Sequence, residues 1–277
     1  MVRIITDSVS DISSADIKAL GIDAVLPLRI FFGEQMYTDG VDLTKPEFYE
    51  KLAACTELPK TSQITPGEFG EVYDQYGNDE IVVITLSSKL SGTYQSAVVA
   101  KETAGREDIH VVDSMNVTCG QGLLVMEAAK MRNRGLSGRE IAEKIEIMKT
   151  RVSLFAMLDT LKYLRMGGRL SATSAVVGSL LNIKPIICVE DGEVKAIGKA
   201  RGEKNGYDYL IGKVKSEEID FDCEVVFAGS NCFEQIEAFA KEAAPQLGIK
   251  GYRLMDIGMT VGVHIGENGR GIAYIRK

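Results

Sequence analysis

The chain has 277 residues, of which 32 are basic and 39 are acidic, and its formal net charge is −7. This balance, without a clustered stripe of Lys and Arg, argues against a nucleic-acid-binding surface. No apolar run reaches the length of a membrane span, and the chain is long for one hydrophobic core but sufficient for two.

The start of the chain and its cysteines favour a cytoplasmic location. A strand-like run begins at residue 2 and leaves no room for a signal peptide. The five cysteines are scattered, odd in number and without C-x-x-C spacing, which favours reduced thiols. Two histidines and these cysteine spacings supply too few soft ligands for a zinc site. We therefore expect a cytoplasmic protein without a metal centre or a cofactor.

Strand-like and helix-like segments alternate through the first half of the chain. The strand-like runs occupy residues 2–6, 25–32, 81–85 and 108–113. Helices are predicted from Ser13 or Ser14 to about Gly21 and over residues 46–54, 66–76, 119–134 and 137–150. Three of these helices start at a Thr or Ser that is followed three residues later by Glu, at Thr44, Thr65 and Ser137. Such alternation predicts a parallel sheet with helices on both faces.

The second half of the chain has a different pattern. Strands are predicted over 152–158 and 183–189, and Asp191-Gly192 predicts a hairpin to the next strand. A second hairpin is predicted from the runs 261–265 and 271–275, and helices are expected near 203–216 and 232–244. We therefore expect an α/β protein with two domains. Residues 1–150 would form a parallel-sheet α/β domain, and residues 151–277 an α+β domain with a mixed or antiparallel sheet.

The most informative segment is the hydroxyl-rich run 87–96, Ser-Ser-Lys-Leu-Ser-Gly-Thr-Tyr-Gln-Ser, which follows the strand at 81–85. It is typical of a strand-to-helix turn at the carboxyl edge of a sheet, where open α/β folds bind ligands. Free amide groups and the positive end of the helix dipole favour an anion there. The turn lacks the Lys of a P-loop, so we expect a small anionic headgroup, either a carboxylate or a phosphate.

Other polar segments are candidates for the same edge. Thr6-Asp7-Ser8 ends the first strand, and Asp113-Ser114 ends another, although turn and cap chemistry explains such residues equally well. In the run 161–170 an apolar helical turn leads into Gly167-Gly168 and then Arg169. A helix C-cap beside a surface Arg is the alternative interpretation of that run.

The two histidines raise the possibility of an enzyme. His110 alternates within a strand and is expected to be structural, whereas His264 lies near the end of a predicted strand. An acyl hydrolase or transferase would use Ser91 as nucleophile with one of these histidines as base. The sequence has no G-x-S-x-G elbow around Ser91, because the glycine follows that serine.

Taken together, the motifs resemble those of the DegV family, the fatty-acid-binding proteins of bacteria. The matching segments, in order along essentially the whole chain, are Thr6-Asp7-Ser8, Thr61-Ser62-Gln63 with Pro66, the run 87–96, the run 161–170 with Gly167-Gly168-Arg169, the run 181–186, and His264.

The resemblance implies two domains with a long-chain fatty acid in a tunnel between them. It implies that Ser91 and Thr61 hold the carboxylate, beside Ser62 and near the Gly92 and Thr93 amides, with His264 close by. Arg169 would lie near the headgroup opening. Several members of the family act as the acyl-carrying subunit of a fatty acid kinase, and a separate ATP-dependent partner then forms an acyl phosphate for phospholipid synthesis.

The sequence thus leaves three functions open. A non-catalytic fatty acid carrier that works with a kinase is the expectation. A serine-dependent acyl hydrolase or transferase with Ser91 and His264 is the alternative, and it would turn over a model ester. A sensor or adaptor would bind lipid without passing it on. Chain length and degree of unsaturation depend on pocket shape.

Overall fold

The computed structural model describes residues 1–171 and 182–277, so Leu181 of the quoted motif lies outside the described residues. Sheet A, the parallel sheet predicted for the first half, is present. It consists of β1 (Val2–Asp7), β2 (Ala24–Leu26), β6 (Glu80–Thr85) and β7 (Ile109–Asp113). Its order is β2-β1-β6-β7 and every pairing is parallel.

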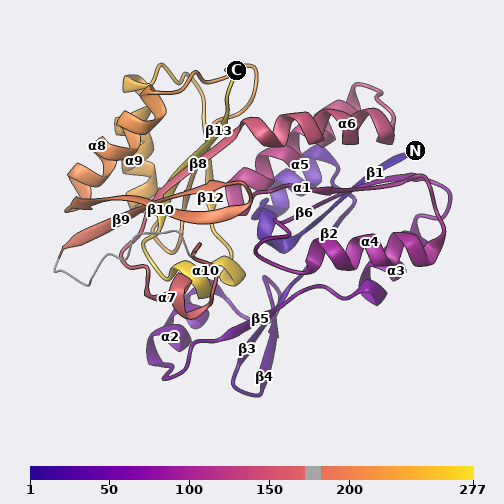
Figure 1. Cartoon of the computed structure of the whole chain (residues 1–277), viewed down its shortest axis with the longest axis horizontal. Helices are drawn as coiled ribbons and strands as arrows, with labels where there is room; N and C mark the ends of the chain where they lie inside the picture. The colour runs from indigo at the N-terminus through magenta and orange to yellow at the C-terminus, as the bar shows by residue number, and fades with distance from the viewer. Residues whose placement is uncertain (172–181) are drawn as a thin grey trace.

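Helices cover both faces of sheet A, as the alternating pattern predicts (Figure 1). They are α1 (Ser14–Leu20), α3 (Pro66–Gln75), α4 (Thr93–Ala104), α5 (Thr118–Asn133) and α6 (Gly138–Met148). The capping boxes predicted at Thr65 and Ser137 are confirmed at the starts of α3 and α6. The box at Thr44 starts α2 (Lys45–Ala54) in the same way. Short 3-10 turns, η1 (Ser8–Ser10) and η2 (Lys149–Arg151), follow β1 and α6.

Sheet C is the mixed sheet predicted for the second half. Its strands are β8 (Val152–Met157), β9 (Ile183–Glu190), β10 (Glu193–Arg201), β11 (Val226–Gly229), β12 (Arg253–Asp256) and β13 (Arg270–Ile275). The order is β10-β9-β8-β13-β11-β12, and only β11 and β12 pair in parallel. The helices α8 (Glu203–Lys215) and α9 (Phe233–Gln246) pack on one face of sheet C through a buried apolar cluster. The α/β fold class is therefore confirmed.

Helix α5 joins the two sheets. It contacts β1 and β6 of sheet A and also β8, β11 and β13 of sheet C. It is buried along almost its whole length, and one continuous apolar cluster extends from sheet A across α5 to sheet C. All strands of sheet A precede residue 150 and all strands of sheet C follow it. Whether residues 1–150 and 151–277 form separate domains stays a prediction.

The predicted strand over 25–32 is divided between sheet A and a third sheet, sheet B. The run 25–32 is not one strand, because Pro27 has no amide hydrogen for a ladder and separates β2 from β3 (Arg29–Phe32). β3 leaves sheet A and forms the antiparallel sheet B with β4 (Gln35–Thr38) and β5 (Lys60–Ser62). Sheet B and α2 lie beside α10 (Met259–Ile265) and the short helix α7 (Lys162–Met166) (Figure 1).

The predicted strand at 261–265 is wrong, because these residues belong to the helix α10. Its apolar residues are buried on nearly all sides, and such a run cannot be told from a buried strand by its periodicity. Gly262 lets the helix approach α2 closely, since an added Cβ would lie 2.9 Å from the ring of Phe48. β13 consequently pairs with β8 and β11, and the predicted closing hairpin does not form.

Candidate functional site

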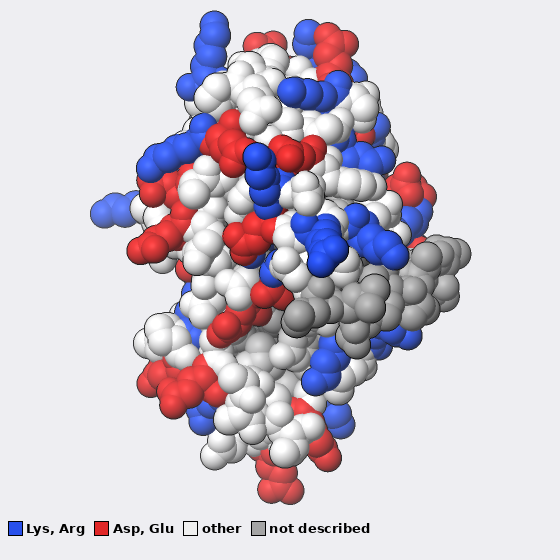
Figure 2. Space-filling model, turned by 90° about the vertical axis from the view of Figure 1, so that its left-hand side faces the viewer, with Lys and Arg blue, Asp and Glu red and all other residues white. Residues whose placement is uncertain are grey.

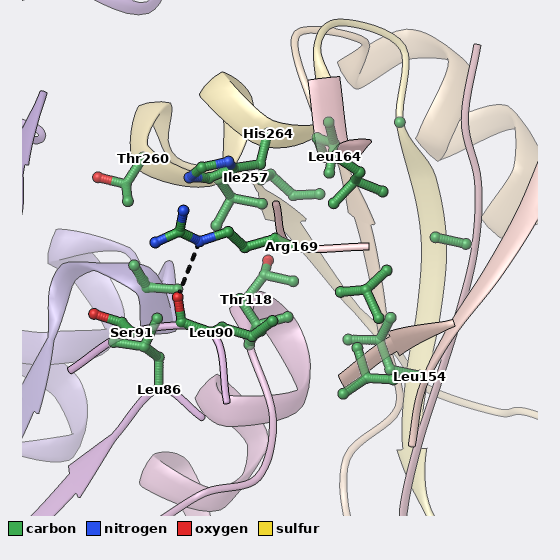
Figure 3. Close-up of a pocket in the computed structure, with 18 of the residues that line it drawn as sticks. Leu86, Leu90, Ser91, Thr118, Leu154, Leu164, Arg169, Ile257, Thr260 and His264 are labelled. Carbon is green, nitrogen blue, oxygen red and sulfur yellow. Dashed lines mark hydrogen bonds between the residues drawn. The ribbon is translucent and has the colours of Figure 1, made fainter. Parts of the chain in front are cut away.

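A cavity of about 310 Å³ lies between the carboxyl edge of sheet A and the face of sheet C opposite α8 and α9 (Figure 3). Most of its wall is apolar and comes from strands β8, β9, β10 and β11, from the start of α5, and from α7 and α10. The apolar lining includes Val9, Leu28, Leu86, Leu90, Leu154, Ala156, Leu164, Ile187, Val189, Val194, Ala228 and Val261. In Figure 3 the side chains of Ser91, Arg169 and His264 gather on one side of the cavity and Leu154 lies on the other. A cavity of this kind suits a ligand with one polar end.

The hydroxyl-rich turn between β6 and α4 is fixed on three sides. The Ser87 amide donates to the Asn116 carbonyl at 2.8 Å, and the Ser87 hydroxyl donates to the Gly192 carbonyl at 2.7 Å. The Ser88 amide donates to a carboxylate oxygen of Asp113 at 3.1 Å, which confirms that the ends of β6 and β7 meet at one edge. The turn therefore presents its later residues at a fixed place in the cavity wall.

Ser91 and Gly92 face the cavity, whereas Thr93 does not. The Ser91 hydroxyl lies 3.0 Å from the Thr93 hydroxyl and accepts from the Thr93 amide at 3.3 Å. Thr93 is fully buried behind Ser91 and is absent from the cavity lining. Because the first amides of a helix have no intrahelical acceptor, the start of α4 adds partial positive charge beside Ser91.

Gln63, next to the predicted Thr61 and Ser62, also lines the cavity. Its side-chain amide donates to the Ser96 hydroxyl at 2.8 Å, and its carbonyl oxygen lies over Gly92. A Cβ on Gly92 would lie only 2.1 Å from that oxygen, so Gln63 would have to move if any other residue replaced this glycine. Gln63 belongs to the Thr61-Ser62-Gln63 motif, but nothing in the local sequence places it against Gly92.

His264 reaches the cavity from the last turn of α10. Its Nε2 lies 3.2 Å from the Thr61 hydroxyl on β5, a contact that joins residues 203 positions apart. Burial, together with the nearby Arg169 cation, lowers the pKa of His264 to about 4, so the ring is neutral at neutral pH. Its Nδ1 is buried and has no hydrogen-bond partner among the described residues.

Arg169 lies between the turn and His264 (Figure 3). Its Nε donates to the Leu90 carbonyl at 3.2 Å and its Nη1 donates to the Gly167 carbonyl at 2.5 Å. Among the described residues its acceptors are neutral carbonyl groups, which leave the positive charge available to an anion in the cavity. Gly168 makes the preceding bend in the left-handed region, with φ of 67°.

The structure thus brings six of the seven predicted site residues to one cavity, namely Thr61, Ser62, Ser91, Gly92, Arg169 and His264. It adds Gln63, Thr118, Thr260 and the buried Arg270 to the polar lining. Thr118 and Thr260 come from the starts of α5 and α10, and Arg270 comes from the start of β13. Only the fold brings these four together, and no spacing in the sequence indicates it.

The hydrolase alternative finds little support in this geometry. His264 Nε2 faces Thr61, and the Ser91 hydroxyl bonds Thr93. A nucleophile–base pair needs the serine within hydrogen-bond reach of the base, and the base oriented by a third group. Nδ1 of His264 has no such group among the described residues. His110, on β7, packs against Gly138 at the start of α6 and is absent from the cavity lining.

Residues 1–171 and 182–277 contain no group of three or more His, Cys, Asp or Glu side chains placed to hold a metal ion. The same residues contain no helix with the length and apolarity that a membrane crossing requires. On the face shown in Figure 2, basic and acidic side chains of the described residues are interspersed. Such mixing differs from the continuous basic stripe of nucleic-acid-binding proteins.

Comparison with known proteins gives matches over the full length. The family model described as an uncharacterised protein of the DegV family matches residues 1–277. A DegV domain-containing protein of Caldanaerobacter subterraneus subsp. tengcongensis is 38% identical over 279 residues, covering 100% of this chain and 99% of that protein.

Solved structures are similar over the same length. A structure described as fatty acid binding of a DegV family protein from Thermus thermophilus has a TM-score of 0.88 at 28% identity and covers 99% of each chain. A DegV family protein from Ruminococcus gnavus, solved with vaccenic acid, has a TM-score of 0.87 at 28% identity. That similarity covers 98% of this chain and 99% of the other.

Proposed function

Because this chain belongs to the DegV family, we propose that its cavity holds a long-chain fatty acid, with the carboxylate at Ser91 and the acyl chain against sheet C. The observation that carries the proposal is the distribution of polar groups in the cavity. Hydroxyls, a neutral imidazole and an arginine gather at one side, and aliphatic side chains form most of the remaining wall. The fatty acids bound by the similar solved structures support the same ligand class.

The energetics of such a ligand suit this wall. Burial of about 14 methylenes at roughly 0.8 kcal/mol each offers on the order of 11 kcal/mol before entropy costs. Removing the carboxylate from water costs several kcal/mol unless it is compensated. Two or three charge-assisted hydrogen bonds, at about 1.5–3 kcal/mol each, offset that cost. The Ser91 and Thr61 hydroxyls and the Arg169 guanidinium are the donors proposed for this purpose.

We further propose that the protein is a cytoplasmic carrier that presents the bound carboxylate to a separate ATP-dependent kinase. In that step a carboxylate oxygen attacks the γ-phosphorus of ATP, an O–P bond forms, and the bond to the β–γ bridging oxygen breaks, so that ADP leaves. The chain itself has no P-loop sequence for a nucleotide. Of the donors proposed for the carboxylate, Ser91 and Thr61 are neutral and only Arg169 is charged, which leaves the carboxylate more nucleophilic than a tight lysine pair would.

Denaturing extraction of the purified protein, followed by mass spectrometry of the released small molecules, tests the ligand. We expect a near-stoichiometric C14–C18 fatty acid, and a lower content in Ser91→Ala than in a control at the exposed Ser14, Ser14→Ala. A protein that is empty and takes up no added fatty acid contradicts the proposal. Turnover of a model ester that Ser91→Ala abolishes would instead establish the hydrolase.

The kinase step needs its own assay. The loaded protein is mixed with ATP and a fatty acid kinase ATP-binding subunit, and acyl phosphate is trapped with hydroxylamine. We expect product only when all three are present, and Arg169→Ala should reduce product formation more than it reduces bound lipid. A loaded protein that yields no acyl phosphate with a competent kinase would favour the sensor or adaptor.

A further inference from the structure

The helix that carries His264 depends on its surroundings. α10 has seven residues, and helices shorter than about 12 residues are marginal on their own. Its β-branched residues Val261, Val263 and Ile265 and its Gly262 further weaken an isolated helix. Contacts with the rest of the molecule must therefore determine where α10 lies and where His264 points.

Two carboxyl groups hold the start of this helix: Asp39 accepts from the backbone of Met259 and Thr260, the first residues of α10, and Asp11 accepts from the residue before them. Asp11 Oδ1 accepts from the amide of Gly258, the residue before α10, at 2.9 Å. Asp11 Oδ2 accepts from the hydroxyl of Thr118, the first residue of α5, at 2.5 Å. Asp11 itself closes the turn η1 after β1. This carboxyl thus joins three elements that meet behind the cavity wall.

The backbone at this junction is in an uncommon conformation. Asp11 has φ of 53° and Thr118 has φ of 48°, both in the left-handed region, which is a genuine outlier for a β-branched residue such as Thr118. The two residues in this conformation are hydrogen-bonded to each other. Strain of this kind persists only where the surrounding structure enforces it, and it concentrates at functional sites.

The junction is close to the proposed headgroup site. Thr118 and Thr260, in the first turns of α5 and α10, both line the cavity together with His264. Asp11 does not line the cavity, and its acceptor oxygens are directed at Thr118 and Gly258. Any role of Asp11 in ligand binding must therefore act through the position of α10.

We propose that Asp11 is a positioning residue, which holds the start of α10 against α5 and thereby sets the contact of His264 with Thr61. The inference rests on the proposed fatty acid site for its affinity readout, but the geometry of His264 tests it independently. Asparagine can replace the carboxyl here, because its oxygen can accept from the Gly258 amide and its nitrogen can donate to the Thr118 hydroxyl. Alanine can do neither.

The test compares Asp11→Ala, Asp11→Asn and Asp23→Ala. Asp23 is the control, since its carboxylate also accepts from a backbone amide, that of Ile4, and pairs with Arg3 and Arg132, but lies outside the cavity lining. The chain has only two histidines, so His110→Gln in every variant leaves the His264 ring as the single imidazole signal in NMR. The measurements are the pH titration of that ring and the dissociation constant for a C16 fatty acid.

In Asp11→Ala we expect the His264 titration midpoint to move up by one unit or more, as the ring is released to water. We expect its fatty acid dissociation constant to rise about 10–30-fold, whereas Asp11→Asn and Asp23→Ala stay within threefold of the parent. An unchanged titration in Asp11→Ala overturns the proposal. Equal shifts in Asp11→Ala and Asp11→Asn, or in Asp11→Ala and Asp23→Ala, overturn it as well.

The role of Asp11 can still be tested if Asp11→Ala does not fold or if the parent protein binds no fatty acid. If Asp11→Ala fails to fold, Thr118→Val removes one of the two contacts and keeps the side-chain shape. It should move the titration in the same direction, and no movement overturns the proposal. If the parent protein binds no fatty acid, the proposed function fails, while the titration alone still confirms or overturns the role of Asp11.

Discussion

Replacing Gly92 by alanine tests the contact that shapes the wall beside Ser91. The backbone of Gly92, with φ of −74° and ψ of 3°, accepts alanine without strain. The added Cβ, however, would lie 2.1 Å from Oε1 and 2.7 Å from Cδ of Gln63. Gln63 must then turn away and lose its hydrogen bond to Ser96. The substitution at Gly92 therefore acts mainly by displacing the side chain of Gln63.

The magnitude follows from two contributions, overpacking and the change of N-cap residue. Overpacking costs about 1–3 kcal/mol, the lost hydrogen bond is part of that range at about 1 kcal/mol, and alanine is a poorer N-cap residue than glycine by up to about 1 kcal/mol. We expect Gly92→Ala to lower the free energy of unfolding by about 1–4 kcal/mol. Gln63→Ala alone should lower it by about 1 kcal/mol, since it removes only the bond to Ser96.

A double-mutant cycle measured by urea denaturation separates these contributions. In Gly92→Ala with Gln63→Ala the clash is gone, so the pair should be less destabilised than the sum of the singles by about 1–3 kcal/mol. The cost of alanine at the N-cap is present both in Gly92→Ala and in the double variant, so it cancels in the coupling energy. Additive effects would show that Gln63 does not occupy the space over Gly92, and the described wall of the cavity would be wrong.

Three further predictions concern His264 and the buried Asp7. In Gly167→Ala the new Cβ would lie 2.5 Å from His264 Nδ1, so the ring should leave Thr61 and the fatty acid content measured by mass spectrometry should fall at least about tenfold. Gly70→Ala, with open space around it in α3, should keep its lipid and lose no more than a few tenths of a kcal/mol. His264 is an ordinary imidazole when unfolded, with a pKa of 6.5, and burial lowers the folded pKa to about 4. Unfolding therefore takes up a proton in this window, so stability should fall by up to about 3 kcal/mol as pH drops from 6.5 to 4. Urea midpoints should show that His264→Gln flattens this slope, and an unchanged slope would contradict a buried neutral ring. Asp7 has the opposite sign, because burial raises its pKa from 3.8 to about 7, although the Leu86 amide opposes the shift. Its contribution is present at low pH and is lost as pH rises from about 4 to 7, so Asp7→Asn should remove that loss, and a steeper decline in the variant would refute the assignment.

Local rules predicted the elements that local chemistry determines. The capping boxes at Thr44, Thr65 and Ser137 start helices where the sequence places them, and the β-branched runs around β1 and β6 form the parallel core. The hairpin at Asp191-Gly192 also forms as predicted. In each case, residues within about four positions of one another carry the signal.

Local sequence rules could not predict the features that depend on contacts between distant residues. The run 261–265 is helical because α2 and sheet B surround it, and its β-branched composition points the other way. Gln63 has a role only because Gly92 passes beneath it. The resemblance of the motifs supplied the candidate site residues, but only the fold shows that Thr93 stands behind Ser91.

The placement of α5 has a consequence for how the molecule comes apart. Both sheets bury apolar surface against α5. If either sheet separates from this helix, it exposes to water the apolar side chains of α5 that also support the other sheet. The two halves should then behave as a single cooperative folding unit, although their strands are separate in sequence. Amide hydrogens in the middle of α5, around Leu124, should exchange with solvent only when the whole chain unfolds. A fragment that ends near residue 150 would present one side of this helix to water and would tend to aggregate.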